Sequence, residues 1–164
     1  MKTLILFASN HGTTAKVSER ISRLIGYNKC KTVNIQEMAP PPLDDFDTVI
    51  IGGSIHFGKV QKKIRQYCEK NLHLLLTKKL GLFICYMDKK HEIDEYLGSF
   101  PTALIQHAHA EGYFGGAFKF EELNFLEKFI VRKKLGLKES ITRIDSQSIN
   151  QFAILMQEKI KISA

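Results

Sequence analysis

The sequence predicts an α/β fold with a parallel sheet covered by helices on both faces. One reason is that five apolar runs alternate along the chain with segments whose apolar residues follow helical spacing. A second reason is that the apolar runs are continuous and do not alternate with polar residues, as in strands buried on both faces. In such sheets right-handed crossovers connect the strands, and ligands lie beyond the strands' carboxyl ends.

The N-terminal part contains two strand candidates on either side of a helix candidate. KTLILFA, within 2–8, is a continuous apolar run that predicts the first strand. Over 13–25 apolar residues recur at helical spacing, and Gly26 stands where a helix C-terminal cap is expected. KTVNI at 31–35 predicts the second strand, and three successive prolines within 37–46 exclude a helix there.

The central part predicts two more strands and two helices. DTVIIGG at 47–53 is the third strand and ends in paired glycines, whereas 60–75 has the apolar spacing of a helix. LGLFICYM at 80–87 predicts the fourth strand. We expect Ser99 to cap a third helix that has Pro101 in its first turn and reaches about His109.

The C-terminal part predicts a fifth strand, GYFGGAF at 112–118, and a closing helix over 149–160. The segment 119–138 does not fit the alternation, and we expect it to be an insertion before the last helix. A length of 164 residues predicts a single domain over 1–164.

The composition is that of a folded domain with a basic charge balance. The 24 Lys and Arg residues exceed the 17 Asp and Glu residues, so the net charge is +7, which favours acidic partners. No apolar run approaches the roughly 20 residues of a membrane span. The N-terminus is expected to be a strand, not a signal peptide. Cys30, Cys68 and Cys85 lack metal-ligand spacing, which favours buried thiols in a reducing cytoplasm.

Other classes of protein lack the residues that they require in this chain. A phosphoacceptor receiver domain needs carboxylates where Ser9-Asn10 and Gly52-Gly53 stand, and a cysteine phosphatase needs Cys-x5-Arg, which is absent. His107 and His109 would point to different sides of a helix, so no metal site is expected. The basic residues are not clustered with aromatics on a recognisable module, so no nucleic-acid partner is expected.

The carboxyl-end rule selects three segments as the ligand site: 9–14, 53–59 and 86–90. The first passes from a buried strand into a helix N-terminus, which offers unpaired backbone N–H groups and the positive end of the helix dipole. Hydroxyls surround a glycine there, and no Lys or Arg is present. This pattern predicts a phosphate held by neutral donors; the alternative is an ordinary helix start capped by Thr13.

Here the chain resembles the flavodoxins, whose phosphate loop has the pattern Thr/Ser-x-Thr-Gly-x-Thr. The corresponding residues are Ser9, Asn10, His11, Gly12, Thr13 and Thr14, with His11 where the family usually has Thr. The resemblance implies a flavodoxin-like three-layer sandwich, a five-stranded parallel sheet of order 2-1-3-4-5, and FMN as the cofactor. If His11 spoils the phosphate site, a flavin-free scaffold remains open.

Two further segments, 49–71 and 115–136, are similar to menaquinone-linked protoporphyrinogen IX dehydrogenases, a flavodoxin-like branch that acts in heme biosynthesis. The resemblance implies an FMN enzyme that oxidises an acidic, porphyrinogen-like substrate and passes electrons to a quinone. It identifies no catalytic residue. The alternative is a flavodoxin-type electron carrier that binds a redox partner protein and has no substrate of its own.

A flavin ring requires flat apolar walls and a few polar contacts. By position these come from two loops, whose candidate residues are Ser54, Ile55, His56, Phe57 and Gly58, and Tyr86, Met87 and Asp88. Phe57 and Tyr86 are the candidate ring neighbours, with core aromatics as the alternative. His56 is a candidate contact to substrate or to the flavin edge, with a solvated loop residue as the alternative.

The charge balance bears on the choice between enzyme and carrier. Two-electron-reduced flavin tends to be negative at its N1 side, and basic surroundings favour that charge. Electron-carrier flavodoxins are strongly acidic, so a net charge of +7 favours an oxidant enzyme.

The segment 119–138 combines apolar and aromatic residues with cations at one end. It contains the apolar residues Phe120, Leu123, Phe125, Leu126, Phe129, Ile130, Val131 and Leu135. The cations at its end are Arg132, Lys133, Lys134 and Lys138. This pattern predicts a peripheral contact with the inner face of a membrane or a substrate-handling element. The alternative is packing on the sheet edge or in a dimer interface.

Overall fold

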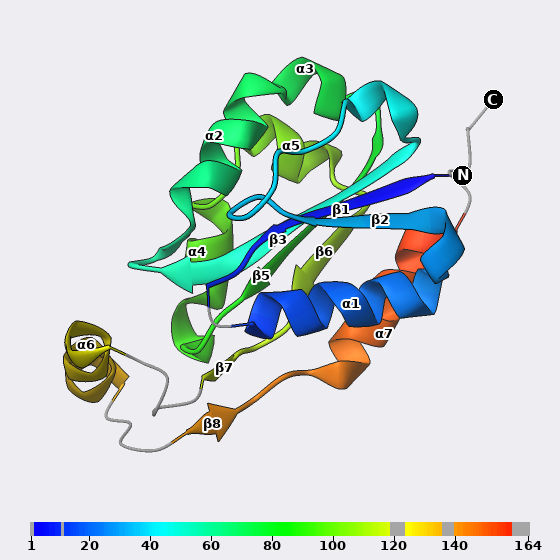
Figure 1. Cartoon of the computed structure of the whole chain (residues 1–164). Coiled ribbons are helices and arrows are strands. Elements are labelled where there is room, and N and C mark those ends of the chain that lie inside the picture. Colours follow the sequence, from blue (N-terminus) through cyan, green and yellow to red (C-terminus); the bar gives the residue numbers. More distant parts are fainter. Residues whose placement is uncertain (1, 11, 119–123, 136–139, 159–164) are drawn as a thin grey trace.

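The computed structural model describes residues 2–10, 12–118, 124–135 and 140–158. Its central sheet has five parallel strands in the order β2-β1-β3-β5-β6, with helices on both faces (Figure 1). The strands are β1 (Thr3–Ala8), β2 (Cys30–Asn34), β3 (Thr48–His56), β5 (Lys79–Cys85) and β6 (Ala110–Tyr113). The predicted fold class and strand order are therefore confirmed.

The helices divide between the two faces of the sheet. One face carries α1 (Thr13–Ile25) and α7 (Ser146–Gln157). The other carries α2 (Lys62–Lys70), α3 (Leu72–Leu75), α4 (Glu92–Leu97) and α5 (Thr102–His107). Short 3₁₀ turns lie at η1 (Tyr27–Lys29), η2 (Leu43–Asp45) and η3 (Lys89–His91).

Burial on both sheet faces explains the continuous apolar runs. Leu4 and Leu6 of β1 pack with α2–α5, and Ile5 and Phe7 pack with α1 and α7. Every residue of β1 and of β5 is buried. Because successive strand residues point to opposite faces, a strand between two helical layers needs apolar residues at nearly every position.

An aromatic cluster joins the sheet to α7. The rings of Phe83 and Phe114 lie 5.2 Å apart, and those of Phe114 and Phe152 lie 5.3 Å apart. A Cβ atom added to Gly52 would lie 2.3 Å from the Phe83 ring. The first of the paired glycines therefore makes room for this ring within the core.

The predicted strand at 112–118 is wrong in its bounds. β6 ends at Tyr113, the backbone turns at Gly115 with φ +66°, and a separate antiparallel pair follows. This pair consists of β7 (Ala117–Phe118) and β8 (Ile141–Thr142). A Cβ atom on Gly115 would lie 1.9 Å from the Arg143 carbonyl oxygen, so the chain after β8 passes directly over this glycine.

Two predicted helices also differ from the structure. The helix expected over 60–75 is divided into α2 and α3, and it is preceded by β4 (Lys59–Val60), which pairs with β3. Ser99 does not cap a helix: it is buried, accepts a hydrogen bond from the Val60 amide at 3.0 Å and donates one to the Glu95 carbonyl. Pro101 precedes α5, which ends at His107.

The C-terminal elements begin with α6 (Phe125–Leu135), which lies beyond the carboxyl edge of the sheet in Figure 1. α7 starts at Ser146, where Asp145 caps it, and ends at Gln157, because Glu158 is extended; both predicted bounds, 149 and 160, are therefore wrong. Phe120, Leu123 and Lys138 of the predicted insertion lie outside the described residues. Within the described part of the chain, no helix is long and apolar enough to cross a bilayer.

Candidate functional site

The loop after β1 enters α1 through a left-handed glycine. Gly12 is the N-cap of α1 with φ +79°, and its N–H donates to Ser9 Oγ at 3.1 Å. The alternative in which Thr13 caps the helix is therefore wrong. Asn34, at the end of β2, fixes the start of the loop, since its side chain accepts from the Ser9 N–H at 3.3 Å and donates to the Ser9 carbonyl at 3.2 Å.

This loop has the properties of a neutral anion site. The first-turn N–H groups of α1 have no acceptor within the helix, and the first turn contains no acidic residue. A Cβ atom on Gly12 would meet no atom within 4 Å, so the loop faces open space. Asn10 is exposed, and His11 lies outside the described residues.

Thr14 has a fully buried hydroxyl below this loop. Its polar neighbour within the described part of the chain is the Cys85 thiol, with which it can share a hydrogen bond. Burial raises the pKa of Cys85 to about 12, and Thr14 opposes that shift. The thiol is therefore protonated at neutral pH and is not a nucleophile.

Gln61 connects the first loop to the second. Its Nε2 donates to the Ala8 carbonyl at 3.1 Å and to Ser54 Oγ at 2.7 Å. Ser54 Oγ lies 3.2 Å from His56 Nε2, so the Ser54 hydroxyl proton is available to that ring. Gln61 Oε1 is buried and has no hydrogen-bond partner among the described residues.

The second loop is a tight β-hairpin at the end of β3. His56 pairs with Lys59, leaving Phe57 and Gly58 as the two turn residues, with φ +54° and +83°. Ser54, Ile55 and His56 are half-buried on β3, whereas 78% of Phe57 is exposed, so Phe57 is not a core aromatic. A left-handed conformation is costly for a residue with a side chain, and such strain is concentrated at functional sites.

The third loop follows β5 and carries Tyr86, Met87 and Asp88, all half-buried. Burial, followed by the hydrogen bond and charge of Glu92, raises the pKa of Tyr86. The hydrogen bond from His91, 2.7 Å away, is the main cause that lowers the pKa of Asp88. At neutral pH this loop therefore presents a protonated phenol and a charged carboxylate.

The segment 115–117 connects the first and third loops. The Tyr86 N–H donates to the Gly115 carbonyl at 3.0 Å, and the Thr13 hydroxyl donates to the Ala117 carbonyl. The three segments predicted from the sequence therefore lie at one edge of the sheet. Their role in binding stays a prediction.

Sequence reasoning missed two residues that organise this edge. Asn34 could have been found because it is polar and lies one residue before the end of the strand predicted at 31–35, on the ligand side. Gln61 gives no comparable signal, because its role depends on the hairpin that folds it back over Ala8 and Ser54.

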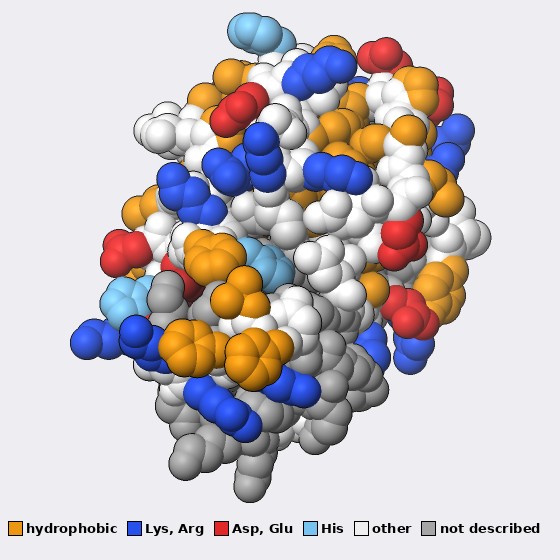
Figure 2. Space-filling view, turned by 60° about the vertical axis from the view of Figure 1, so that its left-hand side comes forward, with side chains coloured by type: hydrophobic (Ala, Val, Ile, Leu, Met, Phe, Trp, Pro, Cys, Tyr) orange, Lys and Arg blue, Asp and Glu red, His pale blue; other side chains and the backbone are white. Residues whose placement is uncertain are grey.

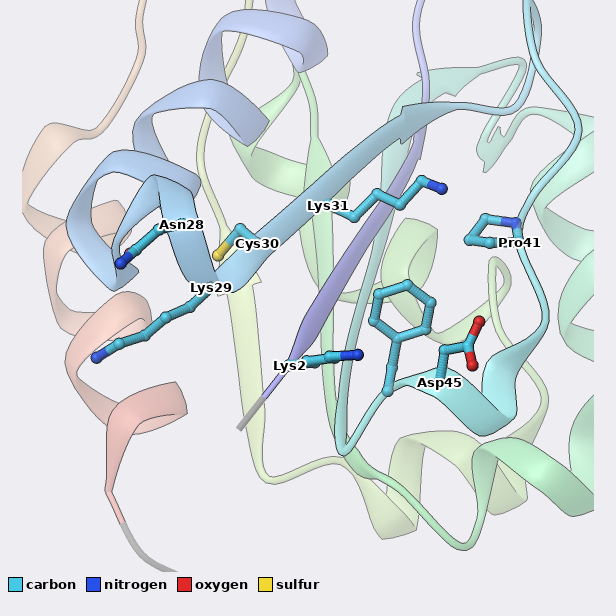
Figure 3. Close-up of a pocket in the computed structure, with 8 residues that line it drawn as sticks. Lys2, Asn28, Lys29, Cys30, Lys31, Pro41 and Asp45 are labelled. Carbon is cyan, nitrogen blue, oxygen red and sulfur yellow. The ribbon is translucent and has the colours of Figure 1, made fainter.

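A separate pocket of about 370 Å³ lies at the opposite, amino edge of the sheet (Figure 3). Its lining residues are Lys2, Asn28, Lys29, Cys30, Lys31, Pro41, Asp45 and Phe46. Lys2 and Lys31 extend toward the side of Asp45 and Pro41, whereas Lys29 extends the other way. The cations of this pocket therefore do not converge on one point.

Comparison with known proteins identifies the family. The profile of the flavodoxin domain matches residues 4–144. The chain belongs to the flavodoxin domain family. A curated relative, protoporphyrinogen IX dehydrogenase [quinone] of Escherichia coli strain K12, is 27% identical over 74 residues. That match covers 43% of this flavodoxin domain chain and only 40% of the relative's length.

Solved flavodoxins have the same fold as this chain. The flavodoxin of Streptococcus pneumonia TIGR4 is 11% identical with a TM-score of 0.58, and oxidised flavodoxin 1 of Bacillus cereus is 15% identical with a TM-score of 0.56. Each alignment covers 95% of this chain and 97% of the other. A Fusobacterium nucleatum flavodoxin bound to flavin mononucleotide is 15% identical with a TM-score of 0.52, over 94% and 96% of the chains.

Proposed function

We propose that the chain binds FMN, with the phosphate at residues 9–14. The observation that carries this proposal is the left-handed Gly12 at the N-terminus of α1, facing open space. The residues fit the group, since helix N–H groups and the Ser9 hydroxyl are neutral donors to a phosphate. The buried Thr14 hydroxyl provides a further polar group beneath the loop.

The isoalloxazine ring would lie between the hairpin and the third loop. Phe57 and Tyr86 offer aromatic walls, and Ser54, His56 and Asp88 offer polar contacts. Bound FMN supplies reversible electron transfer. The protein would orient the ring and, through the hydrogen bonds from Gln61 to Ala8 and Ser54, hold the two flavin-binding loops in fixed relation.

For the reaction, we favour oxidation of an acidic, porphyrinogen-like substrate with a quinone as acceptor, as in heme biosynthesis. Support comes from the name of the partial E. coli relative and from the net charge of +7. Because a quinone acceptor is dissolved in the bilayer, we also propose that this protein is cytoplasmic and contacts the inner membrane face. The second candidate is a flavodoxin-type carrier with a redox partner protein, which the fold shared with solved flavodoxins favours.

Replacement of Gly12 tests the phosphate site. Gly12→Val puts a β-branched residue at φ +79° and fills the space in front of the loop, so FMN affinity is expected to fall roughly thirtyfold or more. Gly26→Val is the matched control, because Gly26 has φ +116° at the other end of α1 and is remote from the loop. FMN titration of both apoproteins decides: wild-type affinity in Gly12→Val would place the phosphate elsewhere.

A second experiment distinguishes the enzyme from the carrier. The FMN-loaded protein is incubated anaerobically with protoporphyrinogen IX and a menaquinone analogue, and porphyrin formation is followed. Turnover supports the enzyme. No turnover with either reactant, together with rapid electron exchange with a flavodoxin reductase, would favour the carrier.

A further inference from the structure

The helix α6 exposes large apolar side chains beside the candidate site. Phe125 is 90% exposed, Leu126 66% and Phe129 56%. Within the described part of the chain, Phe125 and the hairpin residue Phe57 are the two most exposed large hydrophobic residues. Figure 2 shows hydrophobic side chains gathered with Lys and Arg on the side of the molecule where α6 and the hairpin lie in Figure 1.

The exposed apolar residues and two cations share one face of α6. At about 100° per residue, Phe125, Leu126 and Phe129 fall with Arg132 and Lys133 within an arc of about 120°. The apolar residues occupy the first part of this face, and the cations follow them. Lys133 Nζ lies 5.8 Å from the centre of the Phe129 ring, so its charge is next to the aromatic surface.

We propose that this face of α6 docks on an anionic lipid bilayer, with the hairpin tip on the same side. The aromatic and aliphatic side chains would enter the interfacial layer, while Arg132 and Lys133 lie at the depth of the headgroup phosphates. A bilayer fits better than a protein partner, because the buried cores of protein interfaces are depleted in Lys. This inference rests on the proposed function only for the nature of the electron acceptor.

Docking in this way would turn the carboxyl edge of the sheet toward the membrane. The three loops of the candidate site lie at that edge, and the lysines of the amino-edge pocket lie at the opposite one (Figures 1 and 3). A quinone would then reach the site from the bilayer, and the acidic substrate would arrive from solution.

Vesicle flotation of the FMN-loaded protein tests the docking. We expect binding to phosphatidylglycerol-containing vesicles at low salt and none to pure phosphatidylcholine vesicles. Arg132→Glu/Lys133→Glu is expected to lower vesicle affinity by more than about 20-fold. The matched control is Lys29→Glu/Lys31→Glu, which changes the net charge equally at the amino edge and is expected to bind as wild type.

An introduced tryptophan separates insertion from simple charge attraction. The chain contains no Trp, so Phe129→Trp creates a single reporter, and its emission should shift to the blue when anionic vesicles are added. Tyr27→Trp, on the far part of the molecule, should not shift. Absence of the shift in Phe129→Trp would exclude insertion of α6.

Each remaining outcome has a defined meaning. Equal loss of binding in both charge-reversal variants, or no binding of wild type to anionic vesicles, overturns the docking. A dimer that α6 substitutions dissociate, without vesicle binding, assigns the face to a second copy. Flavin absorbance is measured in the same fractions. Protein that carries FMN but does not float contradicts the docking and leaves the proposed function standing. Protein that floats without FMN contradicts the proposed function and leaves the docking standing.

Discussion

A single glutamine fixes the relation between two loops of the candidate site. Gln61 joins the last residue of β1 to the start of the hairpin, and both of its hydrogen bonds are buried or part-buried. Buried hydrogen bonds contribute modestly when made, but a buried polar group left without its partner is costly. Among the residues that the structure describes, Gln61 Oε1 beside Gly53 has no hydrogen-bond partner, so the site carries this cost.

Gln61→Met removes both donors and keeps a side chain of similar length. We expect the free energy of unfolding to fall by about 1–3 kcal/mol, because Ser54 and Ala8 lose their shared partner. Urea denaturation measures this change. Gln66→Met, at an exposed position of α2, the helix that follows Gln61, is the control and should be near neutral. Equal stability of the two variants would show that Gln61 does not hold the loops.

At the scale of elements, α7 depends on a titratable cap. Asp145 accepts hydrogen bonds from the Ser148 and Gln147 N–H groups and from the Ser148 hydroxyl. The bonds from Ser148 are the main cause that lowers the pKa of Asp145 from its ordinary value of 3.8. A carboxyl with a lowered folded-state pKa stabilises the protein above its unfolded-state pKa, and this contribution disappears as the pH falls through the folded-state pKa.

Asp145→Ala is therefore expected to lower the free energy of unfolding by about 1 kcal/mol at pH 7. The difference from wild type should shrink as the pH falls below about 4, because the unfolded-state carboxyl is then protonated and the lowered folded-state pKa is approached. Asp145→Asn keeps an acceptor that does not titrate, so its stability relative to wild type should rise on acidification. Urea unfolding between pH 7 and pH 3.5 checks both trends; a pH-independent difference for Asp145→Ala would contradict the assignment.

The elements show what sequence patterns can and cannot determine. The five central strands were predictable because continuous apolar runs have one physical explanation in a helix-covered sheet. The break at Gly115 was not predictable. GYFGGAF has the pattern of one continuous strand, and the break arises because the Arg143 backbone passes over Gly115 in the folded structure. Ser99 resembles a helix cap in sequence, but its hydroxyl forms hydrogen bonds with backbone groups of β4 and α4.

The candidate site, too, could be predicted only in part from sequence patterns. Ser9, Ser54 and Tyr86 could be placed at one edge because parallel strands end together. The contacts of Gln61 and Asn34 depend on side chains meeting across the fold, which no local pattern encodes.

At the scale of the whole molecule, the net charge of +7 should attract an acidic substrate. Turnover of protoporphyrinogen IX is expected to fall by about threefold or more between low and high ionic strength, because salt screens exposed charges. Lys59→Gln, beside the hairpin, should reduce this salt dependence, whereas Lys31→Gln at the amino edge should not. A rate that is independent of salt would contradict electrostatic recruitment.

The amino edge of the sheet has a different consequence. The Lys2 backbone N–H donates a hydrogen bond to the Asp47 carboxylate, and the Lys79 backbone N–H donates one to the Asp47 carbonyl. The Lys79 side-chain Nζ donates one to the Glu158 carbonyl. The start of β1, the turn before β3, the start of β5 and the residue after α7 are therefore joined at this edge. A surface or label attached at the amino edge is therefore expected to leave the loops of the candidate site, at the opposite edge, accessible to solution.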